Sequence, residues 1–121
     1  MEFKSKEDLE APIEKVFDLM VDFERHERSA LRRGIEISRK DPDGAPGVGT
    51  TWEAHFKFRG KKRKADIRVV EFERPTQITL EAQIQGLGSR VEFSLVALSQ
   101  SRTRLAMVAA AARPRLSKIM P

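Results

Sequence analysis

The sequence predicts an α+β domain in which about seven antiparallel strands form a curved sheet and two short helices follow the first strand. Three observations support this prediction. Apolar residues recur with helical spacing near the N-terminus, and from Ile35 onward they alternate with a period of two. Turn-forming residues separate the alternating runs at short intervals, as in a meander of hairpins. The 121 residues are enough for one hydrophobic core, which predicts one domain over residues 1–121.

The first helix is predicted just after Pro12, because an apolar stripe with i, i+3, i+4 and i+7 spacing begins there and proline suits a first helical turn. The stripe consists of Ile13, Val16, Phe17, Leu19, Met20 and Phe23. A second short helix is predicted over residues 24–33, with Gly34 ending it. Met20 and Phe23 are interpreted as core residues rather than as cofactor contacts.

Six alternating runs after the helices predict six strands, each buried on one face. The breaks between the later runs hold turn-forming residues, at Arg59-Gly60, Glu73-Arg74-Pro75, Gly86-Leu87-Gly88 and Ser99-Gln100-Ser101. Directly opposed residues of an antiparallel pair point to the same face, so each turn can be checked against the apolar pattern.

Closing the hairpins on these turns brings the apolar faces of neighbouring strands together. The predicted registers oppose Trp52 with Ile67, Leu80 with Phe93, and Phe93 with Met107, the second of them by a turn at Gly86-Leu87. A one-residue slip would move the apolar sets to opposite faces, so this register is predicted to be well specified. The alternation breaks at residues 70–72, which predicts a β-bulge and a bend in the sheet.

The opening stretch "LEAPIEKVFDLMVDFERHE" resembles the start of the START/Bet v 1-like superfamily, which includes polyketide cyclase/dehydrase-like proteins. In that family a first strand leads into Ala-Pro, a helix of Val-Phe type and an Asp near its end, as at Ala11-Pro12, Val16-Phe17 and Asp22 here. The segments "VGTTWEAHF" and "FERPTQITLEA" are similar to the family's third strand and its Pro-marked turn. The resemblance spans about residues 1–112 and implies a helix-grip fold with a cavity, whose ligands differ between members.

Family members close this cavity with a long C-terminal helix, and here the sequence departs from the pattern. The chain stops at Pro121, after "ARPRLSKIMP". The resemblance therefore implies that the gripping helix is missing or incomplete in this chain. A truncated or partly ordered chain and a cavity covered by a partner are the open alternatives, and a homodimer is among the expected partners.

The aligned apolar face is predicted to be concave and to hold a hydrophobic or amphipathic small molecule. The candidate ligand-binding residues are Trp52, Phe56, Phe58, Arg63, Ile67, Val69, Leu80, Phe93, Leu95, Leu105 and Met107. Arg63 opposes Phe56 in the predicted register. There its guanidinium either stacks on the ring or pairs with the acid group of an amphipathic ligand.

Catalysis has little support, because the predicted inward positions are nearly all apolar. Outside the basic run, Glu7 and Arg39 are the polar residues whose parity would allow them inside. His26 and His55 are predicted on the surface and do not form a metal-binding pattern. We therefore expect no catalytic residue, no metal and no other cofactor. A cyclase/dehydrase-like enzyme is the alternative to a binding protein.

The net charge of +5 and the run "KFRGKKRKAD" raise a third class, a module that binds nucleic acid or an anionic surface. In the predicted register the lysines at 57, 62 and 64 point away from the neighbouring phenylalanines, whereas single-strand readers combine basic residues with stacking aromatics. A lysine-rich hairpin edge is the favoured interpretation. The absence of cysteine favours a cytoplasmic location, and no apolar run reaches the roughly 18 residues of a membrane span.

Overall fold

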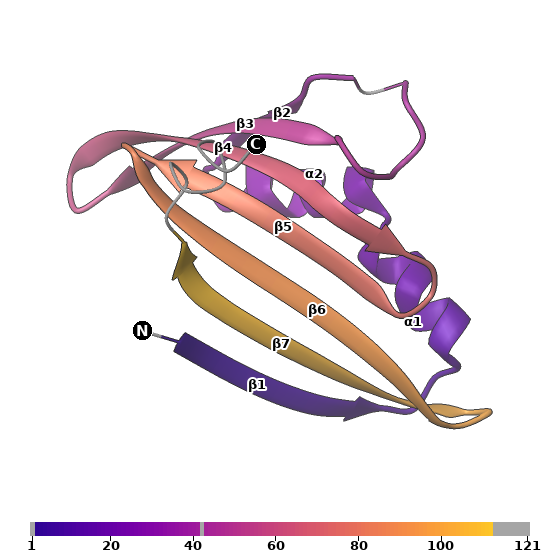
Figure 1. The fold of residues 1–121 in the computed structure, drawn as a ribbon. Coiled ribbons are helices and arrows are strands. Elements are labelled where there is room, and N and C mark those ends of the chain that lie inside the picture. Colours follow the sequence, from indigo (N-terminus) through magenta and orange to yellow (C-terminus); the bar gives the residue numbers. More distant parts are fainter. Residues whose placement is uncertain (1, 42, 113–121) are drawn as a thin grey trace, which may run out of the picture.

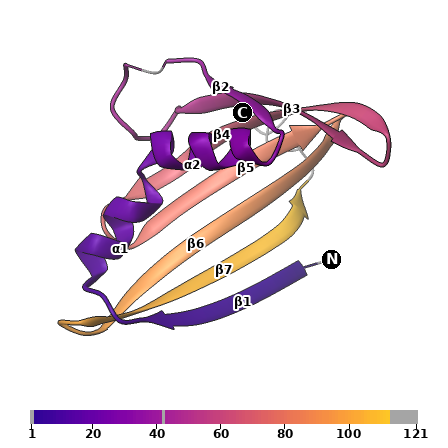
Figure 2. The same cartoon turned by 180° about the vertical axis from the view of Figure 1, so that it is seen from behind.

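A computed structural model describes residues 2–41 and 43–112 of the chain. In this part of the chain, a seven-stranded antiparallel sheet curves around two helices (Figures 1 and 2). The elements are β1 (Glu2–Leu9), α1 (Ile13–Met20), α2 (Phe23–Arg32), β2 (Glu36–Arg39), β3 (Thr51–Phe58), β4 (Lys61–Glu73), β5 (Gln77–Ile84), β6 (Leu87–Ser99) and β7 (Arg102–Ala112). The strand order is β1-β7-β6-β5-β4-β3-β2. The predicted α+β class, with two helices after the first strand, is confirmed.

The first helix begins where the sequence predicts it, but the apolar stripe of that helix crosses a helix boundary. α1 ends at Met20, and Asp22 caps α2 by accepting a hydrogen bond from the backbone N–H of Arg25 at 3.4 Å. Phe23 therefore opens the second helix instead of ending the first. Gly34 follows α2 with φ +83°, a conformation that glycine adopts without strain.

Two of the three predicted hairpin registers are confirmed, and so is the bulge. Trp52 pairs with Ile67 across β3 and β4, and Phe93 pairs with Met107 across β6 and β7. The β4–β5 register shifts between Val69 and Glu71, within one residue of the predicted break in alternation.

The predicted β5–β6 register is wrong by two residues. Leu80 lies opposite Val91 rather than Phe93, because the hairpin turns at Gln85-Gly86. Both turn residues have positive φ, +54° and +81°, as in the two-residue turns that match the twist of paired strands. A shift of two residues keeps every side chain on its predicted face, so the apolar faces still coincide.

Both helices lie on one face of the sheet, with α2 over the β3–β5 side (Figure 2). The core forms between α1 and the sheet, where Phe17 is fully buried and its ring meets Phe72 edge to face at 5.4 Å. Its buried members are Val16, Phe17, Val21, Phe23, Trp52, Val69, Ile78 and Leu95. Neither described helix is long and apolar enough to cross a membrane. The implied loss of a C-terminal gripping helix concerns residues 113–121, which lie outside the described residues.

Candidate ligand cavity

A cavity of about 350 Å³ lies between the helices and the sheet. Its walls come from both helices and from strands β2 to β7. The lining residues are Met20, Phe23, His26, Glu27, Ile37, Trp52, Ile67, Ile78, Leu80, Phe93 and Leu105. Small-molecule pockets typically measure about 300–1,000 Å³ and are mostly apolar with a few placed polar groups, and this cavity fits that description.

Five of the eleven candidate residues line this cavity: Trp52, Ile67, Leu80, Phe93 and Leu105. Period-two alternation directs them to the helix-covered face, where opposed residues on neighbouring strands form a continuous apolar floor. Their part in binding a ligand remains a prediction.

The other candidates on the same strands do not line the cavity. Val69 and Leu95 are buried in the core, and Met107 is half-buried on β7. Phe58 is 53% exposed near the β3–β4 turn, where the Arg59 guanidinium lies 5.2 Å from its ring centroid.

Arg63 does not stack on Phe56, contrary to one of its two predicted roles. Its Nη1 atom donates a hydrogen bond of 2.6 Å to Oε1 of Gln85. Arg63 and Phe56 line a separate hollow of about 450 Å³ near the β3–β4 turn. The alternative, in which Arg63 pairs with an acid group over Trp52, would have to reach from that hollow into the apolar cavity.

Six lining residues were absent from the candidate set: Met20, Phe23, His26, Glu27, Ile37 and Ile78. Met20 and Phe23 pack with the core, as interpreted, and also face the cavity. His26 is exposed, as predicted, yet it lines the cavity, which places it at the rim. The sequence contains one signal for Glu27. It lies four residues after Phe23 and seven after Met20, so a charged residue occupies a position of the otherwise apolar stripe.

Glu27 of α2 forms the polar centre of the cavity wall. Its Oε2 atom accepts a 2.7 Å hydrogen bond from the indole Nε1 of Trp52. Arg39 Nε lies 2.8 Å from the same oxygen in an ion pair without hydrogen-bond alignment. Arg39 Nη2 donates a long hydrogen bond of 3.4 Å to Oε1. The side chains of Arg39 and Glu27 are 9% and 19% exposed, so this is a largely buried pair whose charges balance.

His26 is oriented by the end of the first helix. Its Nε2 atom lies 3.0 Å from the carbonyl oxygen of Leu19 and 3.1 Å from that of Met20. Carbonyl oxygens accept hydrogen bonds and cannot donate them, so Nε2 carries the proton. In the neutral ring, Nδ1 is then an acceptor. The contact also serves two carbonyls at the end of α1, where the helix leaves carbonyls without internal partners.

The two residues named for possible catalysis lie elsewhere. Glu7 is exposed on β1, and Arg39 contacts Glu27 without lining the cavity itself. The acid–base groups that do reach the wall are Glu27 and His26.

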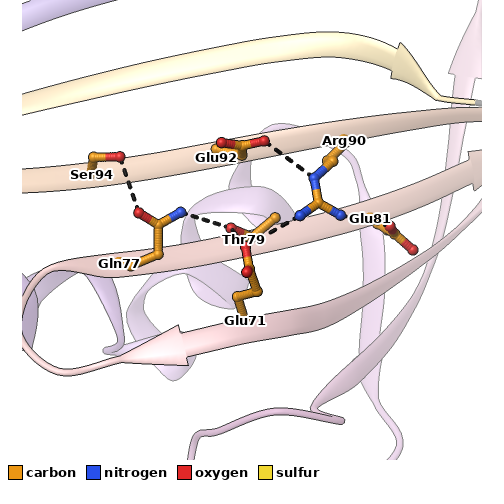
Figure 3. A network of polar contacts seen from close by, with 7 residues as sticks. All are labelled: Glu71, Gln77, Thr79, Glu81, Arg90, Glu92 and Ser94. Atoms are coloured by element: carbon orange, nitrogen blue, oxygen red, sulfur yellow. Dashed lines mark hydrogen bonds and ion pairs between the residues drawn. The ribbon is translucent and has the colours of Figure 1, made fainter.

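The outer face of the sheet is polar, in contrast to the cavity face. There Arg90 of β6 contacts three glutamates, Glu71, Glu81 and Glu92, at 3.2, 3.0 and 3.2 Å (Figure 3). Thr79 is fully buried among these side chains and donates a 2.7 Å hydrogen bond to Glu71.

The basic run contributes Lys57, Lys62 and Lys64 to this outer face. Lys64 Nζ lies 3.5 Å from Glu53 and 4.0 Å from Asp66. The hydrogen bond from His55, followed by the charge of Lys64, lowers the pKa of Glu53. These acidic partners offset the positive charge of the hairpin, which weakens the case for a nucleic-acid module.

No family model matches the chain, and no curated protein matches it in sequence. Solved structures share its fold. The Zhui aromatase/cyclase from Streptomyces sp. R1128 has a TM-score of 0.70 at 11% identity, with 93% of this chain and 67% of that chain covered. Ara h 8.0201 has a TM-score of 0.68 at 16% identity, with 92% and 76% covered. A START superfamily protein from Mycobacterium smegmatis has a TM-score of 0.66 at 18% identity, with 98% and 85% covered.

These similarities establish the fold. The chain has the START/Bet v 1-like helix-grip architecture that the resemblance in its sequence implied. Across eight similar structures it spans 66% to 88% of the other chain's length.

Proposed function

We propose that the protein binds a hydrophobic or amphipathic small molecule in the cavity and does not transform it. One observation carries this proposal: a cavity of about 350 Å³ whose wall is apolar except for a charge-balanced glutamate, a rim histidine and an indole N–H. Transfer of an apolar ligand from water into this cavity would be favourable by about 25 cal/mol of free energy for each Å² of apolar surface buried.

The state of Glu27 supports binding without catalysis. A general acid or base must exchange a proton with the substrate in the transition state. Glu27 accepts a hydrogen bond from Trp52 and forms an ion pair with Arg39, so groups of the protein itself already contact both of its oxygens. A carboxylate held in this way is suited to accept a hydrogen bond from a ligand, and its contacts with the described residues give it no partner that would relay a proton.

A cyclase/dehydrase-like enzyme is the second candidate, because His26 and Glu27 place two titratable groups on the cavity wall. The fold likeness to an aromatase/cyclase is compatible with this reading. Mass spectrometry of a ligand recovered after incubation separates the two functions: an unchanged mass supports binding, and loss of water or a new product supports the enzyme.

Binding is tested by thermal shift and native mass spectrometry with a panel of apolar ligands. A ligand at 100 times its Kd stabilises the folded state by about 2.7 kcal/mol. Leu105→Trp adds bulk to the cavity wall and should abolish the shift, whereas Leu98→Trp changes an exposed residue of β6 and should leave it intact. No shift and no bound mass with any ligand of the panel would contradict the proposal.

A further inference from the structure

The hydrogen-bonding capacity left free on the cavity wall consists of acceptors. Among the eleven lining residues, three have strongly polar side-chain groups: His26, Glu27 and Trp52. The indole N–H of Trp52 is taken by Glu27, and the Nε2 proton of His26 points to two carbonyls of α1. What remains is the carboxylate of Glu27, together with Nδ1 of His26, which accepts hydrogen bonds whenever the ring is uncharged.

The free capacity of Glu27 is on its Oε1 atom. Oε2 already has the Trp52 donor at 2.7 Å and Arg39 Nε at 2.8 Å. Oε1 has one long contact to Arg39 Nη2, at 3.4 Å. A carboxylate offers about four lone-pair positions, so Oε1 can accept a further hydrogen bond from a molecule in the cavity.

The charge balance of the wall selects among possible donors. Arg39 already neutralises Glu27, so a cationic ligand would bring an unbalanced positive charge into an apolar cavity. A carboxylate ligand would bring a second negative charge next to Glu27 and has no hydrogen to donate. A neutral hydroxyl satisfies the acceptor without adding charge.

We propose that the ligand is a neutral, largely apolar molecule with a hydroxyl group, and that this hydroxyl donates a hydrogen bond to Glu27. The inference rests on the proposed binding function and specifies its ligand class. The apolar body of the ligand lies on the floor formed by Ile67, Ile78, Leu80 and Leu105, and Glu27 fixes the end that carries the hydroxyl. Arg63, which lines the separate hollow near the β3–β4 turn and not this cavity, has no part in this recognition.

Four matched probes test the inference: butylbenzene, 4-butylphenol, 4-butylanisole and 4-butylbenzoate. The phenol and the anisole both carry oxygen, but the phenol alone can donate a hydrogen bond. Affinities are measured by calorimetry and by the fluorescence of Trp52, which is the one tryptophan of the sequence and lines the cavity. We expect the phenol to bind about tenfold more tightly than the anisole, as for a hydrogen bond to a charged acceptor, and the benzoate to bind more weakly than the phenol.

The phenol-to-anisole preference is then measured in variants. Glu27→Gln together with Arg39→Gln removes both charges at once, so neither is left buried alone, and the preference should fall about fivefold. Glu24→Gln makes the same change at an exposed position of α2 and should leave the preference unchanged. Far-ultraviolet circular dichroism and retained butylbenzene binding verify that the double variant is folded.

The outcomes separate the two proposals. Binding of all four probes with equal affinity would overturn the hydroxyl inference and leave the binding function standing. A preference that survives unchanged in the double variant would also overturn it, because the acceptor would not be Glu27. Failure of all four probes to bind would overturn the binding function, and this inference with it.

Discussion

Two arginine–glutamate clusters lie on opposite faces of the sheet, and their contact distances are almost the same. Arg39 is 2.8 Å from Glu27 on the cavity face, and Arg90 is 3.0–3.2 Å from three glutamates on the outer face. Their surroundings differ, since the side chain of Arg39 is 9% exposed and that of Arg90 is 36% exposed. Burial and stoichiometry, rather than distance, decide what each cluster contributes.

On the cavity face, one guanidinium balances one carboxylate in surroundings that are largely apolar. Removing either partner leaves an uncompensated buried charge, so the loss of one partner lowers stability by more than the intact pair adds to it. On the outer face, water and salt screen the charges and three carboxylates share one cation. Desolvation lowers the pKa of Arg90, but the hydrogen bonds to Glu92 and Glu81 and the charge of Glu71 outweigh it and raise the pKa.

The largest effect is expected for Glu27→Ala. Arg39 would keep its buried position without a counter-charge, and the indole N–H of Trp52 would lose its acceptor. We expect the free energy of unfolding to fall by about 3 kcal/mol, measured by urea denaturation. Glu92→Ala on the outer face is the matched control, and equal losses in the two variants would contradict the comparison.

The faces of the sheet could be predicted from the sequence because alternation with a period of two specifies them directly. Alternation cannot separate two registers that differ by two residues, since both keep the same face inward. That is why the alternation allows a β5–β6 turn at Gly86-Leu87 although Gln85-Gly86 forms it. The correct choice follows from comparison with Arg59-Gly60, where a non-glycine residue also precedes glycine and both have positive φ.

The cavity was less predictable than the sheet, for a physical reason. Its sheet wall follows from alternation, whereas its helix wall depends on where α2 packs, which no local pattern encodes. Glu27 meets Arg39 twelve residues away and Trp52 twenty-five residues away. A charge at a stripe position signals burial with a partner, but it does not name the partner.

An intermediate effect is expected for Trp52→Phe. The substitution keeps an aromatic ring against Phe23, which now meets Trp52 edge to face at 4.8 Å, and removes the N–H that Glu27 accepts. A hydrogen bond to a charged group contributes about 1.5–3 kcal/mol, and we expect a loss of about 2 kcal/mol in unfolding free energy. A loss below about 0.5 kcal/mol would mean that Arg39 alone holds Glu27 in place.

A smaller effect is expected for Arg90→Gln on the outer face. Exposed ion pairs contribute about 0–1 kcal/mol, and the loss should stay below about 1 kcal/mol despite the three contacts. Because water and salt screen these charges, the difference in unfolding free energy between Arg90→Gln and the wild type should shrink in 1 M NaCl. The corresponding difference for Glu27→Ala should persist, because that ion pair is largely buried. A salt-independent loss above about 2 kcal/mol would show that this network, with its buried Thr79, acts like the inner pair.

The smallest effect concerns pH and the exposed pair of Asp8 and Arg104, which joins β1 to β7. Arg104 donates hydrogen bonds of 2.8 and 3.1 Å to the carboxylate of Asp8. These hydrogen bonds lower the pKa of Asp8, and the positive charges of Arg104 and Arg102 lower it further, whereas desolvation partly opposes the shift. A lowered pKa in the folded state means that the ionised carboxylate stabilises the fold above the unfolded-state pKa. This contribution is lost as the pH falls through the folded-state value, below about pH 4.

Asp8→Asn lacks the titrating group, so its stability should lie slightly below that of the wild type at neutral pH. The two stability curves should converge as the solution is acidified below about pH 4. Urea denaturation at a series of pH values measures the difference. If the gap widened on acidification, the sign of the linkage would be reversed, and the pair could not be one that stabilises the ionised form. If Asp8→Asn lost as much unfolding free energy at neutral pH as Glu27→Ala, solvent exposure would not explain why exposed ion pairs contribute less than the buried pair.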